Sequence, residues 1–112
     1  MALELRASDI EEGSLNEHEL DGHLVLVTRI GGVVHAIGGR CRHLGCHLAR
    51  GTLDGTIVTC PCHGSRFDVI TGKLVEAVTK WPKALRGPVS LAVGDEPVYR
   101  VEEEGETIRV SR

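Results

Sequence analysis

Four residues in two short pairs place the strongest constraint on what this chain can fold into. Cys41 and His43 form a C-x-H pair, Cys60 and His63 form a C-x-x-H pair, and sixteen residues separate the pairs. Two thiolates and two imidazoles at such spacings are typical of a metal site. The other two of the four cysteines fall in the same stretch, residues 41–65. The chain must therefore bring two ligand-bearing loops together.

The residue types leave two kinds of metal open. Two cysteines and two histidines complete a tetrahedral structural zinc site. Zinc fingers place at least one ligand pair on a helix, however, and nothing around residues 41–63 has a helical pattern. The other candidate is a binuclear iron cluster in which one iron takes two thiolates and the other takes two imidazoles. Each loop would then supply one ligand to each iron, which favours iron and leaves zinc as an alternative.

Short apolar runs separated by turn residues predict an all-β domain. Residues 23–29 and 33–37 are two such runs around a Gly-Gly turn, which predicts a β-hairpin. An Asp-Gly pair before residues 56–59 predicts a tight turn, and the resulting hairpin delivers Cys60 to the second loop. Further short strands are predicted at residues 2–7, 66–68, 74–77, 89–93, 98–102 and 107–110. A series of this kind indicates a β-sandwich or barrel.

Charge and hydropathy argue against several classes of function. The net charge is −3 at pH 7, so we expect no basic face for nucleic acid. No run approaches the roughly 20 apolar residues of a membrane helix, and the N-terminal residues do not resemble an export signal. We therefore predict a cytoplasmic chain without membrane insertion. Four cysteines in such a chain suit metal or redox chemistry better than structural disulfides.

The two pairs and the residues around them resemble the Rieske family. The family pattern of C-x-H followed by C-x-x-H is matched at Cys41, His43, Cys60 and His63. The resemblance implies a [2Fe-2S] cluster as the cofactor. It also implies that Cys41 and Cys60 hold the inner iron and that His43 and His63 hold the outer, solvent-facing iron.

The same resemblance implies a fold and its subdivision. We expect an all-β, Rieske-like antiparallel β-sandwich with a small cluster-binding subdomain. Residues 1–112 should form a single Rieske domain. Within it, we expect the cluster-binding subdomain at about residues 38–80 and the base β-sandwich at residues 1–37 and 81–112.

The extra cysteines resemble those of the high-potential branch of the family. Cys46 and Cys62 match the positions at which that branch carries a disulfide joining the two cluster loops. The resemblance therefore implies a disulfide between them. Because the cluster already closes nearly the same loop, we expect this crosslink to add more to the rigidity of the loops than to folding stability.

Four neighbouring residues are candidates for tuning the cluster. Ser65 falls where the high-potential branch has a serine that donates a hydrogen bond to a cluster sulfur. Phe67 departs from that branch, which typically has a tyrosine there, so one donor is missing. The resemblance thus implies a potential above that of disulfide-free Rieske ferredoxins and below the top of the family's range. Leu44 is expected to shield the cluster from water, and Gly64 to permit an unusual backbone angle.

One-electron transfer is the function that the resemblance implies. Ring-hydroxylating oxygenase subunits share the Rieske pattern but need a further domain with a mononuclear iron, for which 112 residues leave no room. We therefore predict an electron carrier that is not itself an enzyme, a soluble Rieske-type ferredoxin between a reductase and an acceptor such as an oxygenase. The alternative is a small subunit or detached domain of a respiratory or nitrite-reductase-like complex. A structural zinc module or a redox-sensing module is a third possibility.

Overall fold

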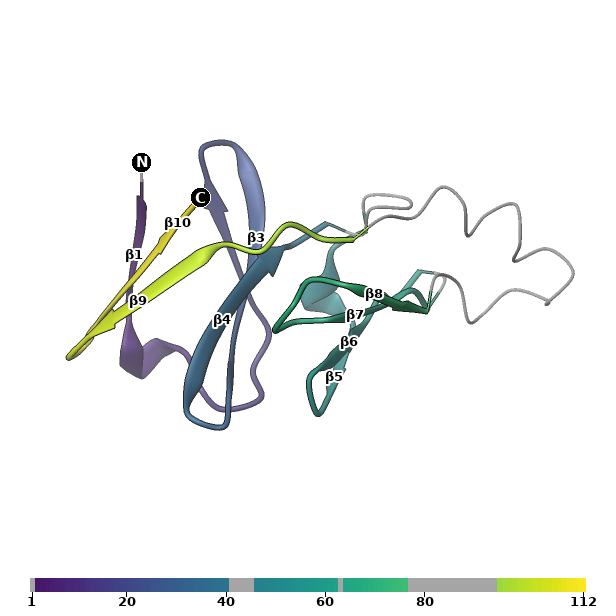
Figure 1. Cartoon of the computed structure of the whole chain (residues 1–112), viewed down its shortest axis with the longest axis horizontal. Helices are drawn as coiled ribbons and strands as arrows, with labels where there is room; N and C mark the ends of the chain where they lie inside the picture. The colour runs from purple at the N-terminus through teal and green to yellow at the C-terminus, as the bar shows by residue number, and fades with distance from the viewer. Residues whose placement is uncertain (1, 41–45, 63, 77–94) are drawn as a thin grey trace, which may run out of the picture.

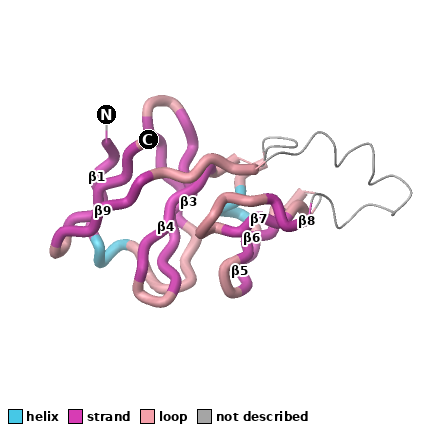
Figure 2. The backbone as a smooth tube through the Cα atoms, in the orientation of Figure 1, coloured by secondary structure: helices cyan, strands magenta, loops and turns pink. Residues whose placement is uncertain are grey.

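The computed structural model describes residues 2–40, 46–62, 64–76 and 95–112. Within these ranges the chain forms three antiparallel sheets (Figure 1). Two short 3-10 helices, η1 (Ala7–Asp9) and η2 (Leu48–Arg50), lie between strands (Figure 2). The predicted all-β fold with antiparallel sheets is confirmed.

The three sheets follow one another along the molecule (Figure 1). The base sheet has the strand order β1-β10-β9, so the first and last strands pair directly. The middle sheet has the order β2-β3-β4, and the loop sheet, which leads to the predicted metal loops, has the order β5-β6-β7-β8. The strands are β1 (Ala2–Arg6), β2 (Asn16–Leu20), β3 (His23–Ile30), β4 (Val33–Gly38), β5 (Thr52–Asp54), β6 (Ile57–Thr59), β7 (Arg66–Asp68), β8 (Leu74–Glu76), β9 (Arg100–Glu104) and β10 (Thr107–Ser111).

The middle sheet is buried on both faces. On β3, Val25 and Val27 pack in the core shared with the base sheet, whereas Leu26 between them packs in the core shared with the loop sheet. On β4, Ala36 and Ile37 divide between the two cores in the same way. A strand covered on both faces needs apolar side chains at successive positions, which explains the unbroken apolar run in β3.

Residues 95–98, the joining segment, tie the middle sheet to the loop sheet. The Gly38 amide at the end of β4 donates a hydrogen bond to the Pro97 carbonyl at 2.9 Å. The Glu96 amide donates to the carbonyl of Gly72, in the turn between β7 and β8, at 2.8 Å. Consecutive residues of one segment therefore bind both sheets, which fixes the position of the loop sheet relative to the rest.

We expect Gly72→Ala to lower the free energy of unfolding by more than Gly105→Ala. Both glycines lie in hairpin turns with positive φ, 73° and 55°, and an alanine in left-handed backbone costs about 1–2 kcal/mol. A Cβ at Gly72 would also meet the Glu96 carbonyl oxygen and the Val98 side chain, whereas one at Gly105 would meet nothing within 4 Å. The additional loss should be about 1–3 kcal/mol in urea denaturation. Equal losses would contradict the close docking of this turn.

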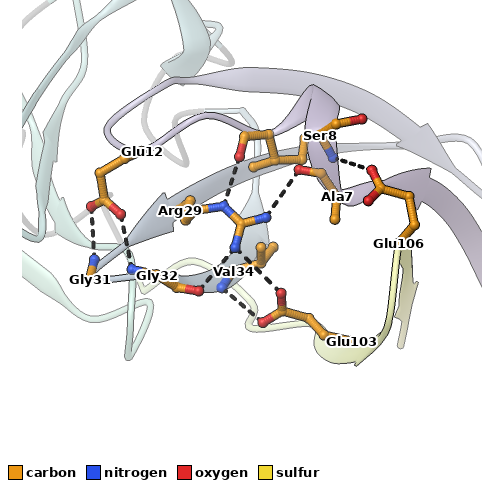
Figure 3. A network of polar contacts seen from close by, with 10 residues as sticks. Ala7, Ser8, Glu12, Arg29, Gly31, Gly32, Val34, Glu103 and Glu106 are labelled. Atoms are coloured by element: carbon orange, nitrogen blue, oxygen red, sulfur yellow. Dashed lines mark hydrogen bonds and ion pairs between the residues drawn. The ribbon is translucent and has the colours of Figure 1, made fainter.

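Arg29 on β3 binds the segment that connects β1 to β2 (Figure 3). Its Nε donates to the Ile10 carbonyl at 2.8 Å, and its Nη2 donates to the Ala7 carbonyl at 3.1 Å. Its Nη1 donates to the Gly32 carbonyl at 2.9 Å and lies 3.5 Å from Glu103 Oε1. Because the guanidinium has several donors in a rigid plane, one side chain joins the N-terminal segment, the middle sheet and β9.

Glu12 closes the turn between β3 and β4. Its carboxylate accepts hydrogen bonds from the Gly31 amide at 2.8 Å and the Gly32 amide at 2.9 Å (Figure 3). The bond from Gly32, followed by that from Gly31, favours the charged carboxylate and so lowers the pKa of Glu12 from its ordinary value. The turn is therefore sensitive to protonation of Glu12.

We expect Glu12→Gln to reduce the acid sensitivity of the fold. A carboxyl group whose pKa is lower in the folded than in the unfolded chain stabilises the fold above its unfolded-state pKa, and this contribution is lost as the pH falls through the folded-state pKa. From about pH 5 to pH 3, the variant should therefore lose less stability than the parent in thermal melts. Some loss will persist, because hydrogen bonds from Ser8 also lower the pKa of Glu106. Identical acid profiles would show that Glu12 contributes nothing.

The structure confirms most of the predicted strands, and β5 and β6 form the hairpin predicted before Cys60. β2 lies where no strand is predicted. The predicted strand at residues 89–93 lies outside the described residues, and the bounds of the two subdomains stay predictions. In the part of the chain that the structure describes, no helix has the length and apolar character needed to cross a bilayer.

Candidate metal centre

The predicted metal ligands fall partly within the described chain. Cys60 directly follows β6 in the loop sheet. Cys41, His43 and His63, and also Leu44, lie outside the described residues. Their roles as ligands and as a shield stay predictions, and the described part of the site is built around Cys60.

A short turn holds the backbone of Cys60. The Cys60 amide donates to the Ser65 carbonyl at 2.7 Å, and the Gly64 amide donates to the Cys60 carbonyl at 3.1 Å. Gly64 has a φ of 76°, in the left-handed region that suits glycine. The turn thereby returns the chain from β6 into β7 and fixes the backbone on either side of the predicted ligand.

The surroundings of Cys60 are apolar and closed to water. Cys60 is 1% exposed and belongs to the same buried cluster as Phe67, Val58 and Leu48. Ser65 is fully buried as well. An apolar shell controls the access of solvent to a metal site, so this environment suits a thiolate ligand. Ser65 and Phe67 lie close to Cys60 along the chain, and their effects on a bound cluster stay predictions.

The predicted disulfide between Cys46 and Cys62 is present. The two residues are bonded, with their Cα atoms 6.5 Å apart. The Sγ atoms of Cys46, Cys60 and Cys62 all lie within 4.8 Å of one another. Because Cys62 uses its sulfur in the disulfide, Cys60 is the cysteine of this loop that lies outside that bond. This arrangement fits the predicted ligand role of Cys60.

The segment that carries Cys46 is anchored to the middle sheet by contacts of its own. Leu48 is fully buried, and its amide donates to the Gly39 carbonyl at 2.9 Å. His47 Nδ1 lies 2.6 Å from Glu17 Oε1 on β2. These contacts fix the position of the Cys46 segment independently of the disulfide. Sequence reasoning missed the pairing of His47 with Glu17, because the partners are 30 residues apart and share no motif.

Cys60, the predicted ligand within the described residues, fits a [2Fe-2S] group. Iron–sulfur clusters bind soft thiolate ligands, and Cys60 supplies a buried sulfur beside an apolar wall. The structure places this sulfur next to a crosslink between two loop segments rather than on a helix. The setting is therefore the strand-and-loop setting predicted for a cluster and differs from a helix-borne zinc site.

The chain is similar to known proteins over its metal loops. The family model described as Rieske [2Fe-2S] domain matches residues 2–86. Apoptosis-inducing factor 3 from Homo sapiens is 41% identical over 66 residues, which cover 59% of this chain and 11% of that protein. Ferredoxin CarAc from Metapseudomonas resinovorans is 39% identical over 67 residues, which cover 59% of this chain and 63% of that protein. The chain thus spans less than two thirds of the length of each relative.

A solved structure shares the fold over nearly the whole chain. It is a chain of the complex of reduced oxygenase and oxidized ferredoxin in carbazole 1,9a-dioxygenase, with a TM-score of 0.79 and 27% identity. The match covers 98% of this chain and 92% of that chain. The likeness therefore extends beyond the metal loops to the sheets that support them.

Proposed function

We propose a function from one established premise: this chain belongs to the Rieske [2Fe-2S] domain family. A [2Fe-2S] group supplies one-electron transfer when it is bound. We propose that the chain acts as a ferredoxin that carries single electrons from a reductase to an oxygenase. The observation that carries this proposal is the buried Cys60 sulfur beside the Cys46–Cys62 disulfide.

We assign the cluster to Cys41 and Cys60 as thiolate ligands and to His43 and His63 as imidazole ligands. The disulfide supports this assignment, because it withdraws the other two cysteines from ligation. The chain's own residues would then have three roles. They would supply sulfur and nitrogen ligands to the irons, exclude water through the apolar core around Cys60, and keep the two loops in a fixed relative position.

We also propose that residues 38–80 form the cluster-binding subdomain and that residues 1–37 and 81–112 form the base. Two features support this division. All four strands of the loop sheet lie between Thr52 and Glu76, and the base sheet is built from both ends of the chain. The cluster-binding part would thus be an insertion into the base.

The proposed partners follow from the relatives. Ferredoxin CarAc is a ferredoxin, and the similar solved chain belongs to a complex of an oxygenase with a ferredoxin. The first supports the role of a ferredoxin, and the second supports an oxygenase as the acceptor. A reductase as donor follows from the chemistry, because a carrier that is oxidised by its acceptor must be reduced again by another protein.

Spectroscopy and metal analysis of the purified chain test the proposal. We expect a red-brown protein with about two irons per chain and a rhombic EPR signal in the reduced state. The reduced chain should also be reoxidised when it is mixed with the oxidised oxygenase of a ferredoxin-dependent dioxygenase. A colourless protein that contains zinc would overturn the cluster assignment. A cluster that no oxygenase reoxidises would overturn the partner assignment alone.

A second candidate is a domain or subunit of a larger electron-transfer assembly. It is favoured by the match to only 11% of apoptosis-inducing factor 3, which places a similar segment within a much longer protein. Co-purification of the chain from its native source discriminates the two. A ferredoxin is recovered as a separate carrier, whereas a subunit remains in a stable complex.

We expect Phe67→Tyr to raise the reduction potential by tens of millivolts. The tyrosine would restore a hydroxyl donor that the high-potential branch of the family uses, and a hydrogen bond that strengthens by about 1 kcal/mol on reduction corresponds to roughly 40 mV. Phe67 is fully buried in the same core cluster as Cys60, so the new hydroxyl would be added inside this cluster. Redox titration of both proteins gives the answer. An unchanged or lower potential would show that the tuning argument fails.

A further inference from the structure

Three sulfur atoms meet at one place beside β6. The Sγ atoms of Cys46, Cys60 and Cys62 all lie within 4.8 Å of one another. Two of them form the disulfide, and the Cys60 sulfur lies outside that bond. The proposed electron-transfer function uses Cys60 as a ligand and the other two as a crosslink. It gives no role to the three sulfurs as a set.

We propose that reduction of the disulfide converts the three sulfurs into a second metal site, a three-thiolate site for a soft cation such as Zn²⁺ or Cu⁺. A dithiol reductant gives two electrons and two protons to the Cys46–Cys62 bond, which opens to two thiols while the reductant closes to its own disulfide. A cation then displaces the protons of the three thiols into solvent. Sulfur ligands select soft cations of this kind over hard ones.

The distances suit such a site after a small movement. Zinc–sulfur bonds of about 2.3 Å place thiolates on one ion about 3.8 Å apart. The Cys60 sulfur is already within 4.8 Å of both others. Breaking their bond allows Cys46 and Cys62 to separate by side-chain rotation, and rotation of the Cys60 side chain closes any distance above about 3.8 Å.

The backbones beside Cys60 and Cys46 are held in place by contacts that do not depend on the disulfide. Beside Cys60, the Gly64 amide donates to the Cys60 carbonyl at 3.1 Å. Beside Cys46, His47 lies 2.6 Å from Glu17, and the buried Leu48 is bonded to the middle sheet. Reduction therefore removes one bond from an arrangement that keeps its other contacts, and the sulfurs remain near one another.

The three cysteines differ in burial, so the proposed metal site has a buried side and a side open to solvent. Cys60 is buried, Cys46 is half-buried and Cys62 is exposed. An ion can thus reach the site from the side of Cys62 and rest against the apolar cluster that contains Cys60. Removal of water from the inner side strengthens the attraction between a cation and its thiolates.

The new site and the proposed cluster exclude each other, because both need the Cys60 sulfur. The disulfide then has a role beyond rigidity: it keeps Cys46 and Cys62 from capturing a soft cation before the cluster is assembled. This inference goes beyond the proposed electron transfer and does not depend on it, since it concerns the cluster-free chain.

Binding of Cd²⁺ to the cluster-free full chain tests the inference, because thiolate-bound Cd²⁺ absorbs in the ultraviolet. Cys41→Ser removes a proposed cluster ligand and leaves the three sulfurs intact. After reduction and removal of the dithiol, this variant should bind one Cd²⁺ with a thiolate absorption band. Without reduction the band should be absent. Adding Cys46→Ser should weaken binding by about 10-fold or more, because one of three ligands is lost.

Alkylation mapping gives a second readout that does not depend on these variants. In the reduced, cluster-free parent, Cd²⁺ should protect Cys46, Cys60 and Cys62 from iodoacetamide and leave Cys41 reactive, as read by mass spectrometry. Protection of Cys41 with Cys60 alone would overturn the inference and would be consistent with the proposed cluster ligands. Equal Cd²⁺ binding with and without Cys46→Ser would overturn it as well. The EPR signal of the loaded parent reports separately on the proposed function.

Discussion

Replacing Cys60 with serine should leave the purified chain without its [2Fe-2S] cluster. Cys60 is the proposed ligand whose surroundings are described, and its sulfur is buried against the apolar core. Changes even outside the ligand shell cost about 10–100-fold in metal affinity, so loss of a ligand itself should weaken cluster binding at least that far and lower the iron content of the purified chain. Iron analysis, visible absorption and the reduced-state EPR signal measure the effect.

The matched control replaces the two disulfide cysteines. Cys46→Ser combined with Cys62→Ser should retain the iron and the EPR signal, because these sulfurs are bonded to each other and are not proposed ligands. This control should lose less than the roughly 3 kcal/mol that closing a loop of this size contributes in a chain-entropy model, because the retained cluster would still close nearly the same loop. If the Cys60→Ser chain keeps a full complement of iron, or if the control loses its cluster equally, the ligand assignment is wrong.

Phe67→Ala should destabilise the fold by about 3–5 kcal/mol, the usual cost of truncating a buried aromatic side chain. Phe67 is fully buried and is the largest side chain in the core between the middle and loop sheets. It pairs with Val58 on β6 at the centre of the loop sheet, so the cavity would open between the two strands that flank the Cys60 turn. Guanidinium unfolding of the parent and the variant measures the loss.

An exposed residue of the same sheet provides the comparison. Val75 on β8 is 53% exposed, and Val75→Ala should change the free energy of unfolding by no more than about 0.5 kcal/mol. If the two variants lose similar amounts, the core between the middle and loop sheets does not support the fold as described.

The β-hairpin of β3 and β4 could be predicted because its residues carry a strong local signal. A continuous apolar run, a Gly-Gly turn and a second apolar run together define two strands and their connection. The sequence does not reveal that β3 is covered on both faces by different sheets. Leu26 and Val27 are both apolar, so the sequence does not show that their side chains belong to different cores. The structure places Val27 in the core shared with the base sheet and Leu26 in the core shared with the loop sheet.

The strand that sequence reasoning missed lacks such a signal. β2 (Asn16–Leu20) has the sequence NEHEL, and Leu20 is its one buried residue. It is an edge strand, so its pairing with β3 depends on backbone hydrogen bonds more than on apolar side chains. β9 begins at Arg100, two residues later than predicted, because residues 95–98 serve to join two sheets.

The part of the candidate site that consists of a sequence motif could be predicted. The spacing of Cys41, His43, Cys60 and His63, with the second cysteine pair, predicted a family and a disulfide. The contacts that support the site could not be predicted, because they join residues that are distant in sequence. The pairing of His47 with Glu17 is one example. The binding of Glu12 to the β3–β4 turn is another.

The hydrogen bond between Gly38 and Pro97 has a consequence for engineering. It brings the two ends of the chain stretch that contains the loop sheet together at the end of β4 in the middle sheet, as in a domain inserted into a host. A stretch with adjacent ends can be transplanted as a module, since a recipient needs only two neighbouring backbone positions to receive it. The apolar contact between the loop sheet and the middle sheet limits which proteins can receive such a graft. A recipient must also offer apolar side chains equivalent to Leu26 and Ile37, on which the module rests.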